Sequence, residues 1–270
     1  MSFIKRPLQR AEEAIAEAEY ILIGAGAGMT TAAGLQYGGP AFEAKFSDMI
    51  GRYGFTDLYT SSFYSFGSEE ERWAYWSRHI DYARFEPEAL PLYKKVHEMV
   101  KDKPHFVITT NVDGQFIKAG FDPEKVFEVQ GDYALIQCAK ACHRKLYPDR
   151  SMVKEMVLRQ SGCKVPSDLV PHCPVCGGPM DINLRKDEYF IQDEHWDLQN
   201  QRYIDFVELS HDKKLVLLEY GVGFNTPTII RIPFERMAAS FPDTTLIRIN
   251  KDHRQLYFSE VKRYIALETL

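Results

Sequence analysis

Short runs of consecutive apolar residues recur along the chain and end at glycines or polar residues. Runs of this kind, bounded by turn-forming residues, are typical of strands that are buried on both faces of a parallel sheet. Helical patterns lie between them, and strands that alternate with helices indicate an α/β fold with a Rossmann-like, doubly wound parallel sheet. The runs predict strands at 20–23, 105–110, 126–129, 215–219 and 245–250.

Amphipathic periodicity and end signals predict helices in the longer connections. The clearest helix has Ser68 and Glu71 as a capping box at its start, and Trp73, Trp76 and Ile80 fall on one of its faces. The first twenty residues have the pattern of a weakly amphipathic helix and lack the apolar core of a signal peptide. The predicted helices are 1–20, 69–85, 88–100 and 194–209.

Five cysteines lie in one short segment, and four of them form two close pairs. Three residues separate Cys138 from Cys142, and two separate Cys173 from Cys176. Two pairs of thiolates can close a tetrahedral zinc site with Zn–S bonds of about 2.3 Å. Such a site has no open position, so we expect one structural zinc ion. The alternative is a set of buried free cysteines, and Cys163 is assigned to packing or to the surface.

The cysteine segment interrupts the alternation of strands and helices, as an inserted module does. We therefore predict a discontinuous Rossmann-like domain, 1–131 and 186–270, that carries a zinc-binding module at 132–185. A helical satellite is expected at 40–85. His143 and His172 flank the cysteine pairs and are alternative zinc ligands.

A glycine-rich turn follows the first apolar run, where residues 24–34 read GAGAGMTTAAG. A strand that leads through glycines into a helix can hold a phosphate, because backbone N–H groups face the anion and glycine allows close approach. Met29 or Thr31 stands where the dinucleotide fingerprint has its third glycine, and no lysine follows as in a Walker loop. The alternative is a tight turn that binds no ligand.

Polar residues follow the second and third predicted strands. Asn111 and Asp113 come directly after the run at 105–110, and Gln130 follows the run at 126–129. Open α/β sheets bind ligands at the carboxyl ends of their strands. An amide and a carboxylate there can hold a nicotinamide carboxamide and a ribose hydroxyl. The alternative is an Asx turn that caps the next helix.

The composition excludes several classes of protein. Apolar residues make up 45% and charged residues 26% of the chain, as in an ordinary globular protein. The formal net charge of -5 provides no general attraction to nucleic acid, and no apolar stretch approaches the roughly 20 residues that a membrane span requires. Clustered cysteines in odd number are unlike a secreted disulfide framework. We expect a cytoplasmic protein that binds neither nucleic acid nor membranes.

Three motifs in order, GAGMTTAAGL at 26–35, TTNVDG at 109–114 and EVQGD at 128–132, precede the two cysteine pairs. This order resembles the sirtuin family over nearly the whole chain. Residues 221–226 look like the family's later G-T-S loop, and 249–250 like its I-N pair. The resemblance implies that NAD is consumed as a co-substrate. The cofactor-binding residues that it implies are Gly26, Ala27, Gly28, Thr30, Thr31, Gly34, Thr110, Asn111, Asp113, Gln130, Gly221, Gly223, Asn225, Thr226 and Asn250.

One departure from the sirtuin pattern changes the expected reaction. Sirtuins have a histidine as general base where this chain has Gln130, and a glutamine amide does not titrate near neutral pH. We therefore expect deacylation by the usual route to be strongly impaired. The family's P-D-F-R segment is also absent from 35–42, so no residue is carried over from it.

Gln130, the Asn-Val-Asp loop and the wider first cysteine pair resemble the macrodomain-linked class M sirtuins. This resemblance implies a protein ADP-ribosyltransferase of the oxidative stress response, whose substrate is a lipoylated glycine-cleavage-H-like carrier protein and whose functional partner is a macrodomain ADP-ribosyl hydrolase. Asn111, Gln130 and Arg185 match the residues implicated in that class, and Asp113 is expected to orient the ribose. The alternative for Arg185 is a surface salt bridge.

Three other functions stay open at this point. A lysine deacylase with an unusual base would release O-acyl-ADP-ribose from an acylated peptide. A non-catalytic NAD sensor would bind the nucleotide and release no nicotinamide. A zinc-ribbon nucleic-acid binder would need a basic stripe around the cysteines, which this sequence lacks.

Overall fold

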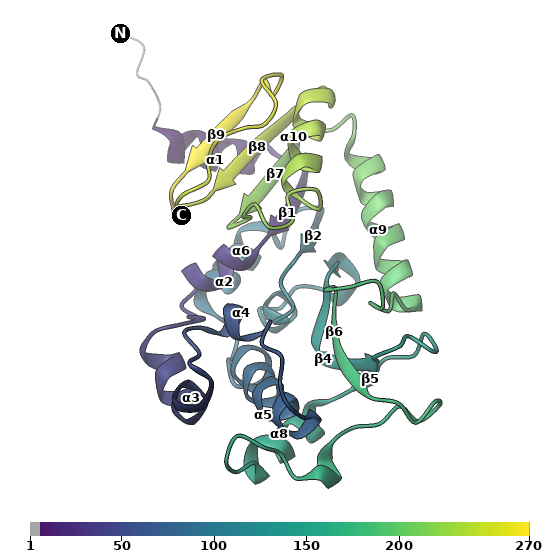
Figure 1. The fold of residues 1–270 in the computed structure, drawn as a ribbon. Coiled ribbons are helices and arrows are strands. Elements are labelled where there is room, and N and C mark those ends of the chain that lie inside the picture. The colour runs from purple at the N-terminus through teal and green to yellow at the C-terminus, as the bar shows by residue number, and fades with distance from the viewer. Residues whose placement is uncertain (1–5, 270) are drawn as a thin grey trace.

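The computed structural model describes residues 6–269 and has a six-stranded parallel sheet at its centre (Figure 1). The strand order is β3-β2-β1-β7-β8-β9, so the chain winds one way from β1 and the other way from β7. The predicted doubly wound sheet is confirmed. The strands are β1 (Tyr20–Ala25), β2 (His105–Thr109), β3 (Val126–Glu128), β7 (Leu215–Tyr220), β8 (Thr244–Ile249) and β9 (Tyr264–Leu267).

Helices cover both faces of this sheet. Ile23 and Val107 face a layer formed by α1 (Pro7–Glu17), α6 (Pro91–Val100) and α7 (Gln115–Lys118). Leu22 and Phe106, one residue before each, face α9 (Glu194–Ser210) and α10 (Arg231–Ser240). Burial on both faces explains the unbroken apolar runs. No helix of the described chain is long and apolar enough to cross a membrane.

A third apolar core lies below the sheet, among α3 (Pro40–Tyr53), α4 (Leu58–Ser61), α5 (Glu69–Ile80) and α8 (Arg150–Arg159). Phe42, Phe46 and Trp73 are buried in it. The helix predicted over 69–85 is present, although its last five residues form a π-helical turn, Asp81–Phe85. Shorter elements are α2 (Ala27–Ala32) and the 3-10 turns Pro123–Lys125 and Ser167–Leu169.

Several predicted boundaries need correction. The helix expected from residue 88 begins at Pro91, because Leu90 is extended, as residues before proline usually are. Ser68 accepts the Glu71 N–H as predicted, but the Glu71 carboxylate accepts the N–H of Gly67 instead of closing the box on Ser68. Strand β9 was not predicted, because its four residues are only alternately buried at the sheet edge. Residues 1–5 of the first predicted helix lie outside the described residues.

The segment between β3 and α9 forms a second, antiparallel sheet. Its order is β5-β4-β6, with β4 (Gly131–Cys138), β5 (Tyr147–Pro148) and β6 (Met180–Leu184). Gly131 pairs with Leu184 at one end of the β4/β6 ladder, and Cys138 pairs with Met180 at the other. This sheet occupies the segment expected to be an inserted module, whereas the division of the chain into domains remains a prediction.

A fully buried ion-pair network ties α10 to the sheet. Arg248 on β8 donates to both oxygens of Glu219 on β7, at 2.6 and 2.8 Å, and to Glu235 on α10, at 2.7 Å. Arg231 on α10 lies 3.4 Å from Glu219 and donates to the carbonyls of two residues in the loop that follows β8. Two cations and two carboxylates therefore compensate one another away from water.

We expect Arg248→Met to lower the free energy of unfolding by about 3–5 kcal/mol, because it leaves the buried carboxylate of Glu235 without an ion pair and Glu219 with only the 3.4 Å contact to Arg231. Arg263→Met is the matched control, because Arg263 pairs with Asp243 at the surface, and its loss should cost less than about 1 kcal/mol. Urea unfolding of the two variants measures both values. Equal losses in the two variants would show that the buried network contributes no more to the free energy of unfolding than the surface ion pair does.

Candidate functional site

Two loops meet backbone to backbone at the carboxyl ends of β1 and β7. The N–H of Gly28 donates to the carbonyl of Gly221 at 3.0 Å, and the N–H of Gly26 donates to that of Tyr220 at 3.0 Å. A Cβ added at Gly28 would lie 2.8 Å from the Cα of Gly221, and one added at Gly221, where φ is +62°, would lie 2.2 Å from the N of Met29. These glycines are therefore required by contact between the loops.

A buried polar cluster lies beneath the glycine-rich turn. The Thr30 hydroxyl donates to a carboxylate oxygen of Asp113 at 2.7 Å and lies 2.7 Å from the Tyr93 hydroxyl. The Asn111 amide nitrogen lies 3.1 Å from the Gly26 carbonyl, from the Thr30 hydroxyl and from the Tyr93 hydroxyl. The structure thus brings together candidates from the loops after β1 and β2.

Burial sets the ionisation of this cluster. It raises the pKa of Asp113, which is 3% exposed, while hydrogen bonds from Thr30 and from the Gln115 N–H act in the opposite direction. Burial also raises the pKa of Tyr93, and the Asp113 carboxylate adds to that rise. Tyr93 was not among the predicted site residues, because the sequence shows it only as one residue on the apolar face of α6.

Gln130 and Arg185 are neighbours across the β4/β6 ladder. The Arg185 N–H donates to the Gln130 carbonyl at 2.9 Å. A Cβ at Gly131, where φ is +103°, would lie 2.1 Å from the Asn183 carbonyl oxygen, so only glycine permits this close approach. Arg185 is exposed and forms no ion pair with any described residue, so the surface salt bridge considered as its alternative role is not formed.

The loop after β7 is held by Asn250, which follows β8. The Asn250 amide nitrogen donates to the Val222 carbonyl at 2.9 Å, and its oxygen accepts two backbone N–H groups from its own turn. The Asn225 amide nitrogen, further along the loop, lies 3.4 Å from the Tyr59 hydroxyl on α4. Asn250 therefore fixes the loop, while the exposed Asn225 reaches the helical satellite.

The remaining cofactor candidates occupy the same edge of the sheet. Thr110 donates its N–H to the Ala25 carbonyl at 3.0 Å, which joins the ends of β2 and β1. Ala27 and Thr31 belong to α2, and Gly34 lies just past its end with a φ of +107°. Gly223 and Thr226 belong to the loop after β7. Their roles toward the cofactor remain predictions.

The four predicted zinc ligands converge. Their sulfur atoms all lie within 4.8 Å of one another, and the Cys138–Cys176 and Cys142–Cys173 pairs are each 3.7 Å apart. A tetrahedron with bonds of about 2.3 Å has edges of about 3.8 Å, so these residues fit a structural zinc ion. His143 lies beside the cluster, with Nδ1 3.1 Å from the Cys142 sulfur.

The fifth cysteine has a packing role. Cys163 is buried in a tight turn, with a φ of +62°, and its thiol donates to Asp48 at 3.4 Å.

The aromatic stretch at 53–66 is divided between core and surface. Phe55 is buried in the satellite core, whereas Tyr59 and Phe63 on and after α4 are exposed.

A buried carboxyl group that the sequence did not suggest lies between β5 and α8. Asp149, just before α8, is fully buried, and neither carboxylate oxygen has a hydrogen-bond partner in the described part of the chain. Burial raises its pKa to about 8, and the charge of Asp132 contributes to this rise. Asp149 is thus held mainly in its neutral form below that pH.

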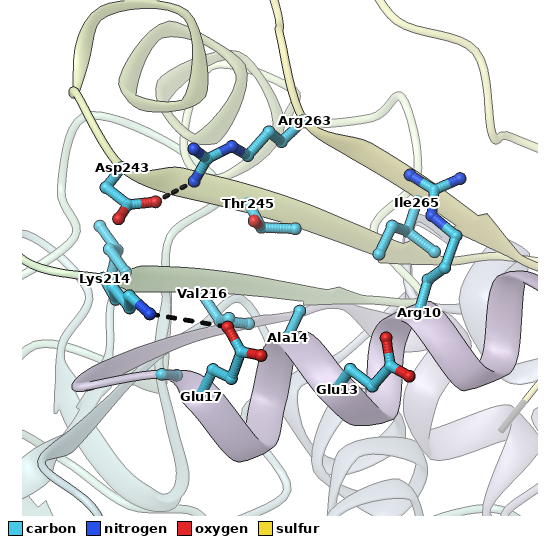
Figure 2. Close-up of a pocket in the computed structure, with 12 residues that line it drawn as sticks. Arg10, Glu13, Ala14, Glu17, Lys214, Val216, Asp243, Thr245, Arg263 and Ile265 are labelled. Carbon is cyan, nitrogen blue, oxygen red and sulfur yellow. Dashed lines mark hydrogen bonds and ion pairs between the residues drawn. The ribbon is translucent and has the colours of Figure 1, made fainter. Parts of the chain in front are cut away.

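A separate hollow of about 490 Å³ lies between α1 and the amino ends of β7, β8 and β9 (Figure 2). Its rim carries the ion pairs of Arg263 with Asp243 and of Lys214 with Glu17. The candidate site residues lie at the opposite, carboxyl ends of the strands. This hollow is therefore distinct from the site.

Comparisons with known proteins agree with this arrangement. No protein-family model matches the sequence. A protein ADP-ribosyltransferase of Staphylococcus aureus is 36% identical over 255 residues, covering 94% of this chain and 81% of its own. A probable bifunctional ADP-ribose hydrolase/ADP-ribosyltransferase of Fusarium oxysporum f. sp. cubense is 30% identical over 84% of this chain and 39% of its own length.

The fold is shared with solved structures. The crystal structure of a Sir2 homologue in complex with NAD superposes with a TM-score of 0.58, covering 95% of this chain and 87% of the other. Sequence identity between the two is 17%, so this likeness concerns the fold alone.

We expect Cys173→Ser to abolish zinc binding and lower the melting temperature, because three thiolates no longer close the tetrahedral site. Cys163→Ser is the matched control and should keep the metal, since its sulfur lies outside the cluster. Elemental analysis of both purified variants measures the zinc content. One full equivalent of zinc in Cys173→Ser would refute the four-cysteine site.

Asp149 should make stability fall as the pH rises. Its pKa of about 8 in the folded protein exceeds the ordinary aspartate value of 3.8, so the folded state retains a proton that the unfolded state releases between these pH values. We expect Asp149→Asn to be more stable than the parent protein by at least about 1 kcal/mol at pH 8, with the advantage shrinking toward pH 5. Denaturant unfolding across this range measures it, and the exposed Asp102→Asn is the control. A pH-independent difference would contradict the assignment.

Proposed function

The chain belongs to the sirtuin-fold protein ADP-ribosyltransferases, which consume NAD, and we propose that its acceptor is a lipoylated carrier protein of the glycine-cleavage-H type. The observation that carries this proposal is the glutamine at position 130, where a deacylase needs a base. The carrier is suggested by the resemblance to class M sirtuins. We also propose a macrodomain hydrolase as functional partner, supported by the Fusarium relative, which is named for both activities.

The loops after β1, β2 and β7 are proposed to hold NAD. The glycine-rich turn follows β1, next to β7, at the point where the strand order switches, and doubly wound sheets bind nucleotides at such switch points. When nicotinamide leaves NAD, positive charge develops at the ribose carbon. Asp113 and Asn111, buried beneath the glycine-rich turn, would orient the ribose and the leaving carboxamide. Positioning of this kind can contribute several kcal/mol to catalysis.

Gln130 and Arg185 are proposed to act on the acceptor side. Gln130 is a hydrogen-bond donor and acceptor but not a base, so the acceptor must be nucleophilic without a strong base from the enzyme. Arg185 is next to it in the ladder, exposed and without an ion-pair partner in the described chain. Its guanidinium is suited to an anionic acceptor or a phosphate oxygen.

The proposal is tested by incubating the enzyme and NAD with a lipoylated H-like carrier protein, and measuring the intact mass of the carrier. We expect an added ADP-ribosyl group on the carrier, and no change in an acetyl-lysine peptide treated in parallel. Asn111→Ala should lose at least about 100-fold in transfer rate, because the amide that joins the two loops is removed. Its zinc content should be unchanged.

Each other outcome points elsewhere. Removal of the acetyl group from the peptide would mean that Gln130 does not block deacylation, and the proposal would be wrong. A carrier that is modified equally with and without lipoate would remove lipoate from the recognition. An Asn111→Ala protein with full activity would overturn the assignment of this residue to the site.

A further inference from the structure

One arginine contacts both of the loops that carry the proposed catalytic residues. Arg84, in the π-helical turn Asp81–Phe85, donates from Nε and Nη2 to the two carboxylate oxygens of Asp132, at 2.7 and 3.0 Å. Asp132 lies two residues after Gln130. The guanidinium also lies against Gly114, one residue after Asp113, where an added Cβ would be 2.3 Å from the Arg84 Cζ.

We propose that Arg84 is a positioning residue that holds the Gln130–Asp132 segment in register with the Asn111–Gly114 loop. In doing so it sets the distance between the group that receives ADP-ribose and the ribose that is attacked. This inference rests on the proposed function, because that function assigns the acceptor to Gln130 and the ribose to Asp113.

The backbone around Arg84 is fastened to the same loop. Lys118, at the end of α7, donates to the carbonyl of Arg84 and, at 2.8 Å, to that of Pro87. The Gln115 side-chain oxygen accepts the Leu90 N–H at 2.9 Å. These bonds join the segment 84–90 to α7 and to the loop that contains Asp113. The backbone of Arg84 is therefore held in place, and its guanidinium is positioned to bind Asp132.

The π-helical turn accounts for the direction of the side chain. An α-helix that widens to a π turn changes the face on which the next residues lie, and such turns are frequent at functional sites. In this turn Asp81 pairs with Lys154 of α8, and the Tyr82 hydroxyl donates to the Gln36 carbonyl at 2.7 Å. Asp81 and Tyr82 are thus held by the satellite and its neighbours, while Arg84 faces the catalytic loops.

The guanidinium also balances charge at this place. Burial raises the pKa of Asp113 and of Glu128, and the positive charge of Arg84 acts in the opposite direction on both. The negative charge of Asp132 contributes to the raised pKa values of Glu128 and Asp149. The arginine side chain is 16% exposed, so water screens these interactions only in part.

The chain provides a matched control six residues earlier in the same helix. Arg78 donates to both oxygens of Asp48 at 2.6 and 2.7 Å, which is the same bidentate chemistry, but its partner is in α3. Its side chain is 17% exposed, like that of Arg84. Arg78→Met therefore removes a comparable ion pair and leaves the catalytic loops untouched.

The test measures nicotinamide release from NAD in the full-length enzyme, with water and with the carrier as acceptor. We expect Arg84→Met to lower kcat by about 100-fold, because misplacing reacting groups by about 1 Å has an effect of this size. The KM for NAD should stay within about threefold, since a positioning role gives the arginine no bond of its own to NAD. Arg84→Lys should recover only part of the rate, because an ammonium cannot make the two parallel bonds. Arg78→Met should keep kcat.

Two further variants test whether Arg84 acts through its ion pair with Asp132. Asp132→Asn breaks the same pair without a change in shape, so it should lower kcat as well, and adding Arg84→Met to it should have little further effect. Equal falls in kcat for Arg78→Met and Arg84→Met, corrected for folded protein, would overturn the proposal, as would a change confined to KM. A parent enzyme that releases nicotinamide but leaves the carrier unmodified would refute the acceptor alone.

Discussion

The contact between two loop backbones at the carboxyl edge of the sheet is the constraint on which the rest of the structure depends. Gly28 and Gly221 approach so closely that neither can carry a side chain, and their hydrogen bond joins the ends of β1 and β7. The strand order reverses between these two strands. The Asn111 amide then ties the loop after β2 to the same place through the Gly26 carbonyl.

The polar groups beneath this contact satisfy one another. Thr30, Asn111, Asp113 and Tyr93 form hydrogen bonds within a buried cluster, so their side chains are already held in place before a ligand arrives. Preorganised dipoles of this kind are effective where charge develops during a reaction. If Gln130 has the proposed role, positioning and local charge would take the place of a titrating base.

The antiparallel sheet carries the acceptor side of the proposed site. The β4/β6 ladder has Cys138, one of the four clustered cysteines, at one end and the Gln130–Arg185 hydrogen bond at the other. A zinc ion bound by the four cysteines would hold the first end in place, and it would thereby stabilise the pairing that brings Arg185 beside Gln130. One small sheet would then carry both a structural metal and the residues proposed for the acceptor side.

The sequence by itself determined the features that local patterns record. Unbroken apolar runs located five of the six central strands, and spacing alone identified the four cysteines that converge. The ordered motifs around Asn111 and Gln130 indicated the family. Only the tertiary structure decided which distant residues support them: Tyr93 meets Thr30 across 63 positions, and Arg84 meets Asp132 across 48. Periodic patterns in a sequence predict only which residues share a face of one strand or helix. The contacts of Tyr93 and Arg84 depend instead on how the central sheet, the π turn and the antiparallel sheet pack together.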